Sequence, residues 1–382
     1  MRVLLVNRFF GGTQVPTGRM LHDLAEELAN RGWQVRVLTG DAEYAGASSM
    51  AGNRHDSSIT RLWTARGTTR LLSWSLFWLQ AVVLIPFMSW DRCVILTDPP
   101  FLVVAARLAK CLNRRRKIFW WTMDLFPEAL TAGHVFPSGG LVERFLRQFN
   151  EFGLKAVNGV VTLGSMQRRR LETYSHFRGD ESFSIVVPPW DQRPLQLQAG
   201  RLNRVRPLFK WEGKKVALYA GNLGRGHSYQ DLIQAAEILA AEDKSWILGF
   251  FCRGAGKPKL RLAAGQLPNV VVEDYVSPEL TADLLHSADV HLITMEDGWE
   301  GVVVPSKLYG VLGTGIPVLF VGPPDADTAN EVLNHGAGEV LPNGCGGRAV
   351  VAALNRLAAA AKPPATSLDR KGPGDIASFV VA

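Results

Sequence analysis

The residues best suited to binding an anion lie in two loops, each directly after an apolar run that predicts a buried strand. In the first loop, residues 220–227 (AGNLGRGH), Arg225 stands between two glycines that let the backbone approach a phosphate, and an arginine can hold a phosphate through two hydrogen bonds. The second loop follows residues 290–294 and ends at Pro305-Ser306-Lys307, where a helix is predicted to begin. A lysine opposes the positive end of a helix, so its presence there favours an anion nearby. A simple connecting turn and an exposed first-turn lysine are the structural alternatives.

Three carboxylates lie near the predicted strand ends. Glu300 precedes Gly301 in the second loop, and Asp124 and Glu128 follow an apolar run at 118–121. Glu300 is as well suited to a ligand hydroxyl as to a solvated loop. Asp124 and Glu128 leave the same two alternatives open, since Glu128 also favours a helix N-terminus.

Metal and thiol chemistry have little support. Asp325 and Asp327 have DxD spacing, but they follow two prolines at a predicted helix start, where aspartate is an ordinary capping residue. The four cysteines form no CxxC pair and fit reduced thiols of a cytosolic protein. We expect no metal and no cofactor, and His227 is the best functional candidate among the histidines.

Strands and helices alternate in both halves of the chain, joined by short loops. A length of 382 residues exceeds one ordinary core, and the alternation predicts an α/β protein of two Rossmann-like, doubly wound parallel-sheet domains facing a cleft. The expected boundaries are 1–200 and 207–361, with 362–382 as a loose tail. In such sheets ligands bind outside the carboxyl ends of the strands, where both loops are expected to lie.

The composition is that of a folded protein with affinity for anions. Hydrophobic residues make up 47%, charged residues 20%, and the net charge is +7. A nucleic acid, an anionic membrane or a phosphorylated ligand would each fit this charge. The aromatic residues form no RNA-binding motif, so we expect no nucleic-acid partner. The apolar run at 2–6 is too short for a signal peptide.

A charge-free segment at 71–90 leaves three alternatives open: a buried domain helix, a helix dipping into a membrane surface, and a transmembrane span. Polar residues interrupt it and a predicted strand follows at once, which disfavours the span. The basic cluster at 114–117 is either a solvated helix end or a contact to anionic lipid.

Taken together, the motifs resemble glycosyltransferase family 4, the retaining enzymes of GT-B fold that use nucleotide sugars, and most closely its bacterial O-antigen, capsule and exopolysaccharide branch. The likeness covers roughly residues 1–360. The motifs that carry it are Gly11-Gly12, residues 121–128 (WTMDLFPE), 187–191 (VPPWD), 220–227 (AGNLGRGH) and 288–292 (ADVHL), and the run from Glu300-Gly301 through Pro305-Ser306-Lys307 to Gly315-Ile316-Pro317-Val318.

This resemblance implies a site without a dedicated nucleophile. Arg225 and Lys307 would neutralise the departing diphosphate, Glu300 would bind sugar hydroxyls, and Asp124 would face the acceptor. Gly12 and Thr13 would approach the diphosphate through backbone N–H groups, and Arg253 to Gly256 with Tyr275 would line the base pocket. The implied donor-binding residues are Gly12, Thr13, Gly221, Asn222, Gly224, Arg225, Arg253, Gly254, Gly256, Tyr275, Glu300, Gly301, Val302, Ser306 and Lys307. The implied donor is a UDP- or GDP-sugar, with no metal required.

The sequence departs from the family pattern in two places. Gly310 stands where a second glutamate usually holds the ribose, and no C-terminal helix returning to the first domain is evident in 362–382. The implied acceptor is a lipid-linked or free saccharide, with the enzyme cytoplasmic and peripheral at the inner face of the plasma membrane. A nucleotide-sugar epimerase of the same architecture and a non-catalytic nucleotide-sugar-binding partner subunit remain as alternatives.

Overall fold

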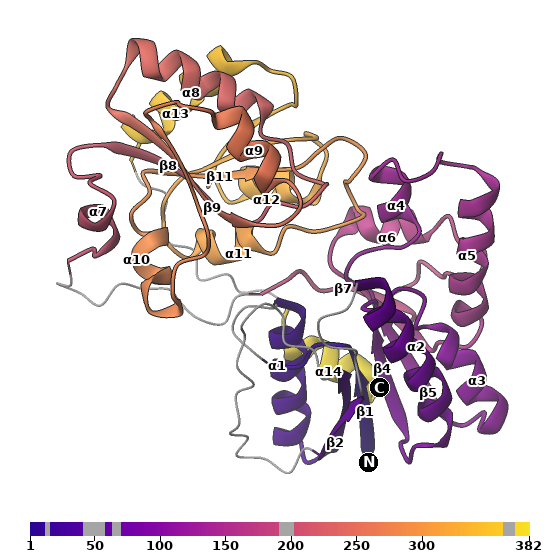
Figure 1. The fold of residues 1–382 in the computed structure, drawn as a ribbon. Coiled ribbons are helices and arrows are strands. Elements are labelled where there is room, and N and C mark those ends of the chain that lie inside the picture. The colour runs from indigo at the N-terminus through magenta and orange to yellow at the C-terminus, as the bar shows by residue number, and fades with distance from the viewer. Residues whose placement is uncertain (12–15, 41–57, 63–69, 191–201, 362–370) are drawn as a thin grey trace. The chain divides into compact units, whose positions relative to one another are not determined.

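The computed structural model describes residues 1–11, 16–40, 58–62, 70–190, 202–361 and 371–382; Figure 1 draws the remaining residues in grey. The chain divides into two compact units, which are described separately. The first comprises Met1–Pro189, Gly301–Val304 and Arg370–Ala382, and the second comprises Trp190–Glu300 and Pro305–Asp369. The expected domain limit at residue 200 lies outside the described residues.

The first unit contains a seven-stranded sheet in which every pairing is parallel. Its strands are β1 (Arg2–Val6), β2 (Gln34–Gly40), β3 (Ser58–Leu62), β4 (Arg92–Leu96), β5 (Lys117–Trp121), β6 (Gly159–Thr162) and β7 (Ser184–Val186). They lie in the order β3-β2-β1-β4-β5-β6-β7. Strands such as β4 (RCVIL) are almost wholly apolar because a parallel sheet is covered on both faces.

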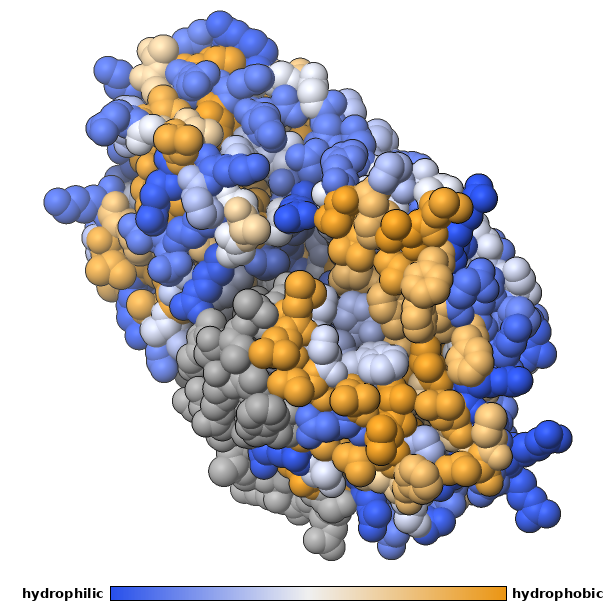
Figure 2. All heavy atoms as spheres, turned by 45° about the vertical axis from the view of Figure 1, so that its right-hand side comes forward, coloured by the Kyte–Doolittle hydropathy of each residue, from blue (hydrophilic) through white to orange (hydrophobic). Residues whose placement is uncertain are grey.

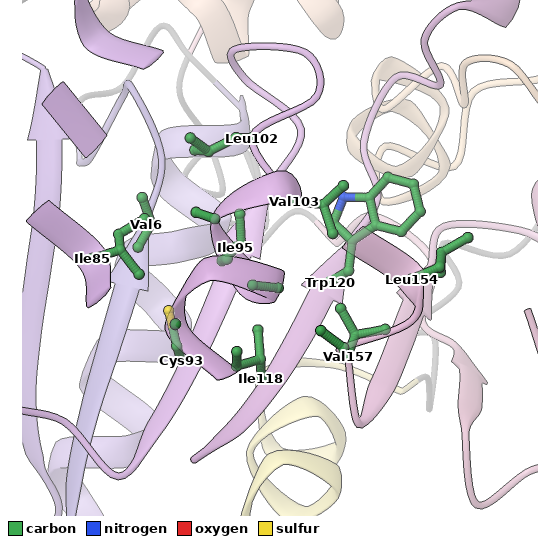
Figure 3. Close-up of a cluster of buried hydrophobic side chains, with 14 of the residues drawn as sticks. Val6, Ile85, Cys93, Ile95, Leu102, Val103, Ile118, Trp120, Leu154 and Val157 are labelled. Atoms are coloured by element: carbon green, nitrogen blue, oxygen red, sulfur yellow. The ribbon is translucent and has the colours of Figure 1, made fainter. Parts of the chain in front are cut away.

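Helices cover this sheet on both faces (Figure 1). They are α1 (Pro16–Asn30), α2 (Arg70–Phe87), α3 (Val104–Leu112), α4 (Glu128–Ala132), α5 (Leu141–Leu154), α6 (Ser165–Leu171) and α14 (Pro373–Val381). The packed row α2, α3 and α5 shares a buried cluster with alternate strand residues, among them Val6, Ile95 and Trp120 (Figure 3). Side chains alternate along a strand, so Phe119, the neighbour of Trp120 on β5, points to the opposite face of the sheet. There its ring centre lies 5.5 Å from that of Phe379 on α14.

The prediction of a loose tail at 362–382 is wrong for residues 373–381, which form α14. Ile376, Ala377 and Val380 are buried, and the Arg31 guanidinium donates to the Gly374 carbonyl oxygen at 2.9 Å. The chain therefore ends in the first unit, and the returning C-terminal helix is present. The several prolines and glycines of residues 362–382 favour a loose tail, but proline fits the first turn of a helix, where its missing N–H costs nothing.

The segment at 71–90 forms α2 and the turn after it. Phe77, Ala81 and Ile85 of α2 are fully buried in the first unit, which agrees with a domain helix. Over the described ranges, the structure contains no helix with both the length and the hydropathy needed to cross a membrane.

The second unit contains a six-stranded parallel sheet in the order β10-β9-β8-β11-β12-β13. Its strands are β8 (Lys215–Asn222), β9 (Trp246–Arg253), β10 (Val270–Glu273), β11 (Val290–Thr294), β12 (Val318–Val321) and β13 (Gly338–Leu341). Its helices are α7 (Val205–Leu208), α8 (Gln230–Glu242), α9 (Lys257–Ala264), the 3-10 turn η1 (Pro278–Leu280), α10 (Thr281–Leu285), α11 (Lys307–Leu312), α12 (Asp327–Asn334) and α13 (Gly347–Ala359). The two parallel sheets confirm the predicted fold class.

Candidate functional site

The strand order of the second unit reverses between β8 and β11. From β8 the chain adds β9 and β10 on one side, then crosses back to β11 and adds β12 and β13 on the other. In a parallel sheet all carboxyl ends lie on one edge, and the point where the order reverses opens a crevice that binds ligands. The loop after β8 and the loop after β11 carry the two predicted anion-binding motifs, and both begin at this edge.

Lys307 reaches back from the first residue of α11 to β8. Its Nζ donates to the Tyr219 hydroxyl at 2.5 Å and lies 3.9 Å from the centre of the Tyr219 ring. The Tyr219 hydroxyl in turn donates to the Asn222 carbonyl oxygen at 2.8 Å. Because α11 has only six residues, the site depends on the lysine and its tyrosine partner rather than on a helix dipole.

Burial sets the protonation of this pair. It lowers the pKa of Lys307 from 10.5 to about 7, and it raises the pKa of Tyr219 well above 10. Near neutral pH the tyrosine is therefore an uncharged phenol, whereas Lys307 is divided between amine and ammonium. An arriving anion would favour the ammonium form, so Lys307 can respond to a phosphate by taking up a proton.

His227 completes the cluster. Its Nδ1 lies 2.6 Å from the Thr294 carbonyl oxygen, and a carbonyl can only accept, so Nδ1 carries the proton and Nε2 keeps a lone pair. Burial, together with the charge of Lys307, lowers the pKa of His227 to about 3. The neutral ring stands edge-on to Tyr219 with centroids 6.1 Å apart. His227 can thus accept a hydrogen bond from a ligand hydroxyl.

The Gly-rich loops after β8 and β9 hold each other in place. Leu223 N–H donates to the Arg253 carbonyl oxygen at 2.7 Å, and Gly256 N–H donates to the Leu223 carbonyl oxygen at 2.8 Å. Gly254 has φ +116°, and a Cβ there would lie 2.6 Å from the Leu223 carbonyl oxygen, so only glycine fits. The guanidinium of Arg253 lies 5.1 Å from the Tyr275 ring, which brings two predicted base-pocket residues together.

The loop after β8 also packs against the loop after β11. A Cβ on Gly226 would lie 2.7 Å from the Trp299 ring, and Glu296 N–H donates to the Gly226 carbonyl oxygen at 3.0 Å. Arg225, which directly precedes Gly226, has an exposed side chain with no hydrogen bond or ion pair to the described residues. A fixed backbone therefore presents a guanidinium that is available to a ligand.

The remaining predicted residues of this edge are placed as follows. Gly221, Gly224, Glu300 and Ser306 are half-buried, and Asn222 is exposed. Gly221 lies beside Lys307, since a Cβ on it would be 3.5 Å from Lys307 Cε. Gly310, which stands where the family pattern has a glutamate, lies within α11.

Other predicted residues lie in the first unit or outside the description. Gly301 and Val302 are grouped with the first unit, where the Val302 carbonyl oxygen accepts from Leu125 N–H at 2.9 Å. Asp124 follows β5 and is exposed. Gly12 and Thr13 lie outside the described residues.

Glu128 has a structural role in the first unit. Its Oε1 accepts from the Tyr174 hydroxyl at 2.7 Å and from Arg147 Nη1 at 3.3 Å, and its side chain is buried. Of the two alternatives for this carboxylate, the structural one agrees with these contacts.

One group in the described residues has the geometry to hold a metal ion, namely His22, Asp23 and Glu26 on α1. It belongs to the first unit, far in sequence from the edge described above. Asp325 and Asp327 belong to no such group within the described ranges.

Comparison with known proteins shows which proteins the chain is similar to. Residues 17–190 match the family described as "Glycosyl transferase 4-like domain". Over 344 residues the chain is 25% identical to the putative colanic acid biosynthesis glycosyl transferase WcaI of Escherichia coli (strain K12), with 82% of this chain and 82% of the relative covered. The chain is therefore similar to family 4-like glycosyltransferases, and the family match lies in its first 190 residues.

Solved structures share the fold of this chain. WaaG, a glycosyltransferase involved in lipopolysaccharide biosynthesis, matches with a TM-score of 0.67 at 14% identity, covering 100% of both chains. Anabaena HepE, in complex with UDP and glucose, matches with a TM-score of 0.66 at 13% identity, covering 100% of this chain and 96% of that one. At these identities the likeness concerns the fold alone, and it confirms the GT-B architecture.

Two side-chain contacts near the strand ends could not be predicted from the sequence. Tyr219 lies in the apolar run of β8, yet its hydroxyl is the partner of Lys307, 88 residues away. In the first unit, Arg8 and Asp98 follow β1 and β4, where that strand order reverses, and Arg8 Nε lies 3.2 Å from Asp98 Oδ1. The available signal was a charged residue two positions after each of two buried strands.

Proposed function

We propose that this chain is a glycosyltransferase that moves a hexosyl group from a UDP- or GDP-sugar to a lipid-linked saccharide, with retention, in bacterial surface polysaccharide biosynthesis. The observation that carries the proposal is the Lys307–Tyr219 pair, with neutral His227 beside it, at the ligand-binding edge of the second sheet. A cytoplasmic enzyme acting at the inner face of the plasma membrane would meet both substrates.

The proposed chemistry is stabilisation of a leaving group. As the sugar–phosphate bond breaks, negative charge grows on the departing diphosphate while the sugar becomes oxocarbenium-like. Lys307 and Arg225 would meet that charge, and fixed cations in a partly dry site stabilise it because they need no reorganisation. We expect this to suffice without a metal or a cofactor.

The sugar and the base would be held by the neighbouring groups. Glu300 and the Nε2 lone pair of His227 can accept hydrogen bonds from sugar hydroxyls. Arg253 and Tyr275, already in contact, offer a cation and an aromatic face to a nucleobase. Asp124 remains the proposed acceptor-facing carboxylate.

The proposal is tested with a panel of nucleotide sugars and a membrane extract as the source of acceptor. Transfer releases a nucleoside diphosphate and labels an extractable saccharide. Formation of an isomeric nucleotide sugar without acceptor would instead indicate an epimerase, and binding without turnover would indicate a regulatory subunit. Either of these two results would overturn the proposal.

The pH dependence of donor binding follows from Lys307. Its pKa is lowered to about 7 in the free protein, and a bound diphosphate raises it because an opposite charge favours the ammonium form. Above pH 7 binding must therefore take up a proton, so the association constant falls as pH rises, by about 30-fold between roughly pH 6 and pH 8.5. Calorimetric titration with the intact nucleotide sugar, whose diphosphate does not titrate in this range, measures the fall.

Lys307→Arg provides the control, because arginine stays charged throughout this range. The variant should bind the donor with an affinity that does not change with pH. A pH-independent affinity in the unchanged protein would contradict the role given to Lys307.

A further inference from the structure

The first unit has an exposed apolar face that plays no part in the proposed donor site. It is formed by the packed row α2, α3 and α5, and Figure 2, which brings the right-hand side of Figure 1 forward, shows hydrophobic residues gathered there. The exposed apolar residues of this face are Leu71, Leu72, Leu79, Val83, Leu84 and Phe87 on α2, Leu108 and Leu112 on α3, and Leu141, Val142, Phe145 and Phe152 on α5. We call this set the α2–α3–α5 face.

Helix α2 is apolar on two opposite sides. Phe77, Ala81 and Ile85 recur every four residues and are fully buried against the sheet. Residues 79, 83 and 87 recur with the same spacing but are offset by two positions, which turns them about 200° around the helix. Leu79, Val83 and Phe87 are 58%, 53% and 76% exposed. The core accounts for the first side only, so the second must meet another apolar phase or remain in contact with water.

Neighbouring helices extend the same surface. On α5, Phe145 is 64% exposed and Phe152 42% exposed, seven residues apart and therefore on one side of the helix. On α3, Leu108 and Leu112 are separated by one turn. Soluble monomers seldom expose contiguous apolar patches of this extent without a binding role.

The charges around the α2–α3–α5 face are cationic. Arg114 and Arg115, after α3, and Arg144 on α5 are exposed, whereas residues 71–87 carry no charge. The acidic residues of α5 are already engaged: Glu143 accepts from Gly139 N–H at 2.6 Å, and Glu151 accepts from Ser175 N–H at 2.6 Å.

The other two cations of the basic cluster have structural partners. Arg116 Nη2 donates to the Met88 carbonyl oxygen at 2.8 Å, with its guanidinium 4.3 Å from the Trp90 ring, and so holds the C-terminal end of α2. Lys117 Nζ donates to the Ala382 oxygen at 2.9 Å. Within the cluster at 114–117, Arg114 and Arg115 are exposed. Of the two alternatives for this cluster, a contact to anionic lipid therefore concerns these two arginines.

We infer that the α2–α3–α5 face docks the protein onto an anionic lipid bilayer. Apolar side chains without a charged residue among them suit the acyl boundary, and peripheral arginines suit anionic headgroups. This combination favours a lipid surface over a second copy of the chain, because facing copies would bring the same cations together. The inference rests on the proposed function only in that the acceptor is lipid-linked.

Vesicle co-sedimentation tests the inference without donor or acceptor. The protein should sediment with vesicles of phosphatidylcholine mixed with phosphatidylglycerol, less with pure phosphatidylcholine, and less as salt is added. The combined variant Leu79→Gln, Val83→Gln, Phe87→Gln should lose most of this binding. The variant Arg114→Gln, Arg115→Gln should weaken it by about 25-fold, since each surface cation contributes about fivefold.

Matched controls come from the second unit. Leu262→Gln with Leu333→Gln removes exposed leucines, and Lys259→Gln with Lys244→Gln removes two exposed cations. Both should bind vesicles as the unchanged protein does, and circular dichroism should show all variants folded. Equal binding by all variants, no binding by the unchanged protein, or a dimer in solution that the α2 variant dissociates would each overturn the inference. Donor titration is measured separately, so this failure would leave the donor site standing.

Discussion

Replacing Lys307 by alanine reduces kcat for sugar transfer by at least about 100-fold. Loss of one preorganised donor to a developing negative charge typically costs about 2.7–4 kcal/mol of transition-state stabilisation. Lys307 sits at the point where the second sheet reverses its strand order, held at 2.5 Å by Tyr219. Initial rates of nucleoside diphosphate release at saturating donor measure the effect.

Two further variants separate the charge of Lys307 from its position. Lys307→Arg keeps a cation but cannot reproduce the contact with the Tyr219 hydroxyl, so we expect activity between that of the unchanged protein and the alanine variant. Tyr219→Phe keeps the ring below the amine and removes only the hydroxyl, so we expect a smaller loss than for Lys307→Ala. Full activity of Lys307→Ala would remove the lysine from the mechanism.

Arg225→Ala should have an effect of similar size for a different structural reason. Its side chain is exposed, while the backbone around it is fixed where Gly226 packs against Trp299. The variant should therefore fold with unchanged thermal stability, yet lose about 100-fold or more in turnover if the guanidinium meets the leaving diphosphate. A fall in kcat with little change in KM would show that the contact strengthens in the transition state.

Arg348→Ala is the matched control for Arg225→Ala. Arg348 is an exposed arginine of the same unit whose partner, Glu242, forms a surface ion pair of small energetic value. Its removal should leave turnover unchanged. If Arg225→Ala were as active as Arg348→Ala, the leaving group would be neutralised elsewhere.

The fold could be predicted from the sequence because its strands are buried on both faces. Runs such as residues 2–6 and 290–294 are mostly apolar, and the helices between them show the usual spacing. The C-terminal helix was missed because residues 362–382 contain several prolines and glycines and show only a weak helical pattern. Its residues Ile376 and Val380 are buried, and its Phe379 packs against Phe119, more than 250 residues earlier, a contact that local patterns do not contain.

The sequence indicated the motifs of the candidate site but not the hydrogen-bond partners of their side chains. The Gly-rich turns and Lys307 stand out locally, because glycines let the backbone approach an anion and a lysine at a helix start opposes the helix dipole. The Tyr219 hydroxyl and the Thr294 carbonyl oxygen, which orient Lys307 and His227, belong to strands whose sequence indicates only burial. For Glu128 the sequence left a ligand contact and a structural role open, and the hydrogen bond from the Tyr174 hydroxyl, a contact between distant residues, favours the structural role.

The central claim is that the edge formed by β8 and β11 binds a nucleotide sugar whose hexosyl group the enzyme transfers. The most direct measurement is the stoichiometry of nucleoside diphosphate released to sugar incorporated into lipid-extractable saccharide, with and without membrane extract. We predict equal amounts of both products, formed only with extract and lost in Lys307→Ala. Nucleotide release without extract, or incorporation that survives Lys307→Ala, would contradict the account.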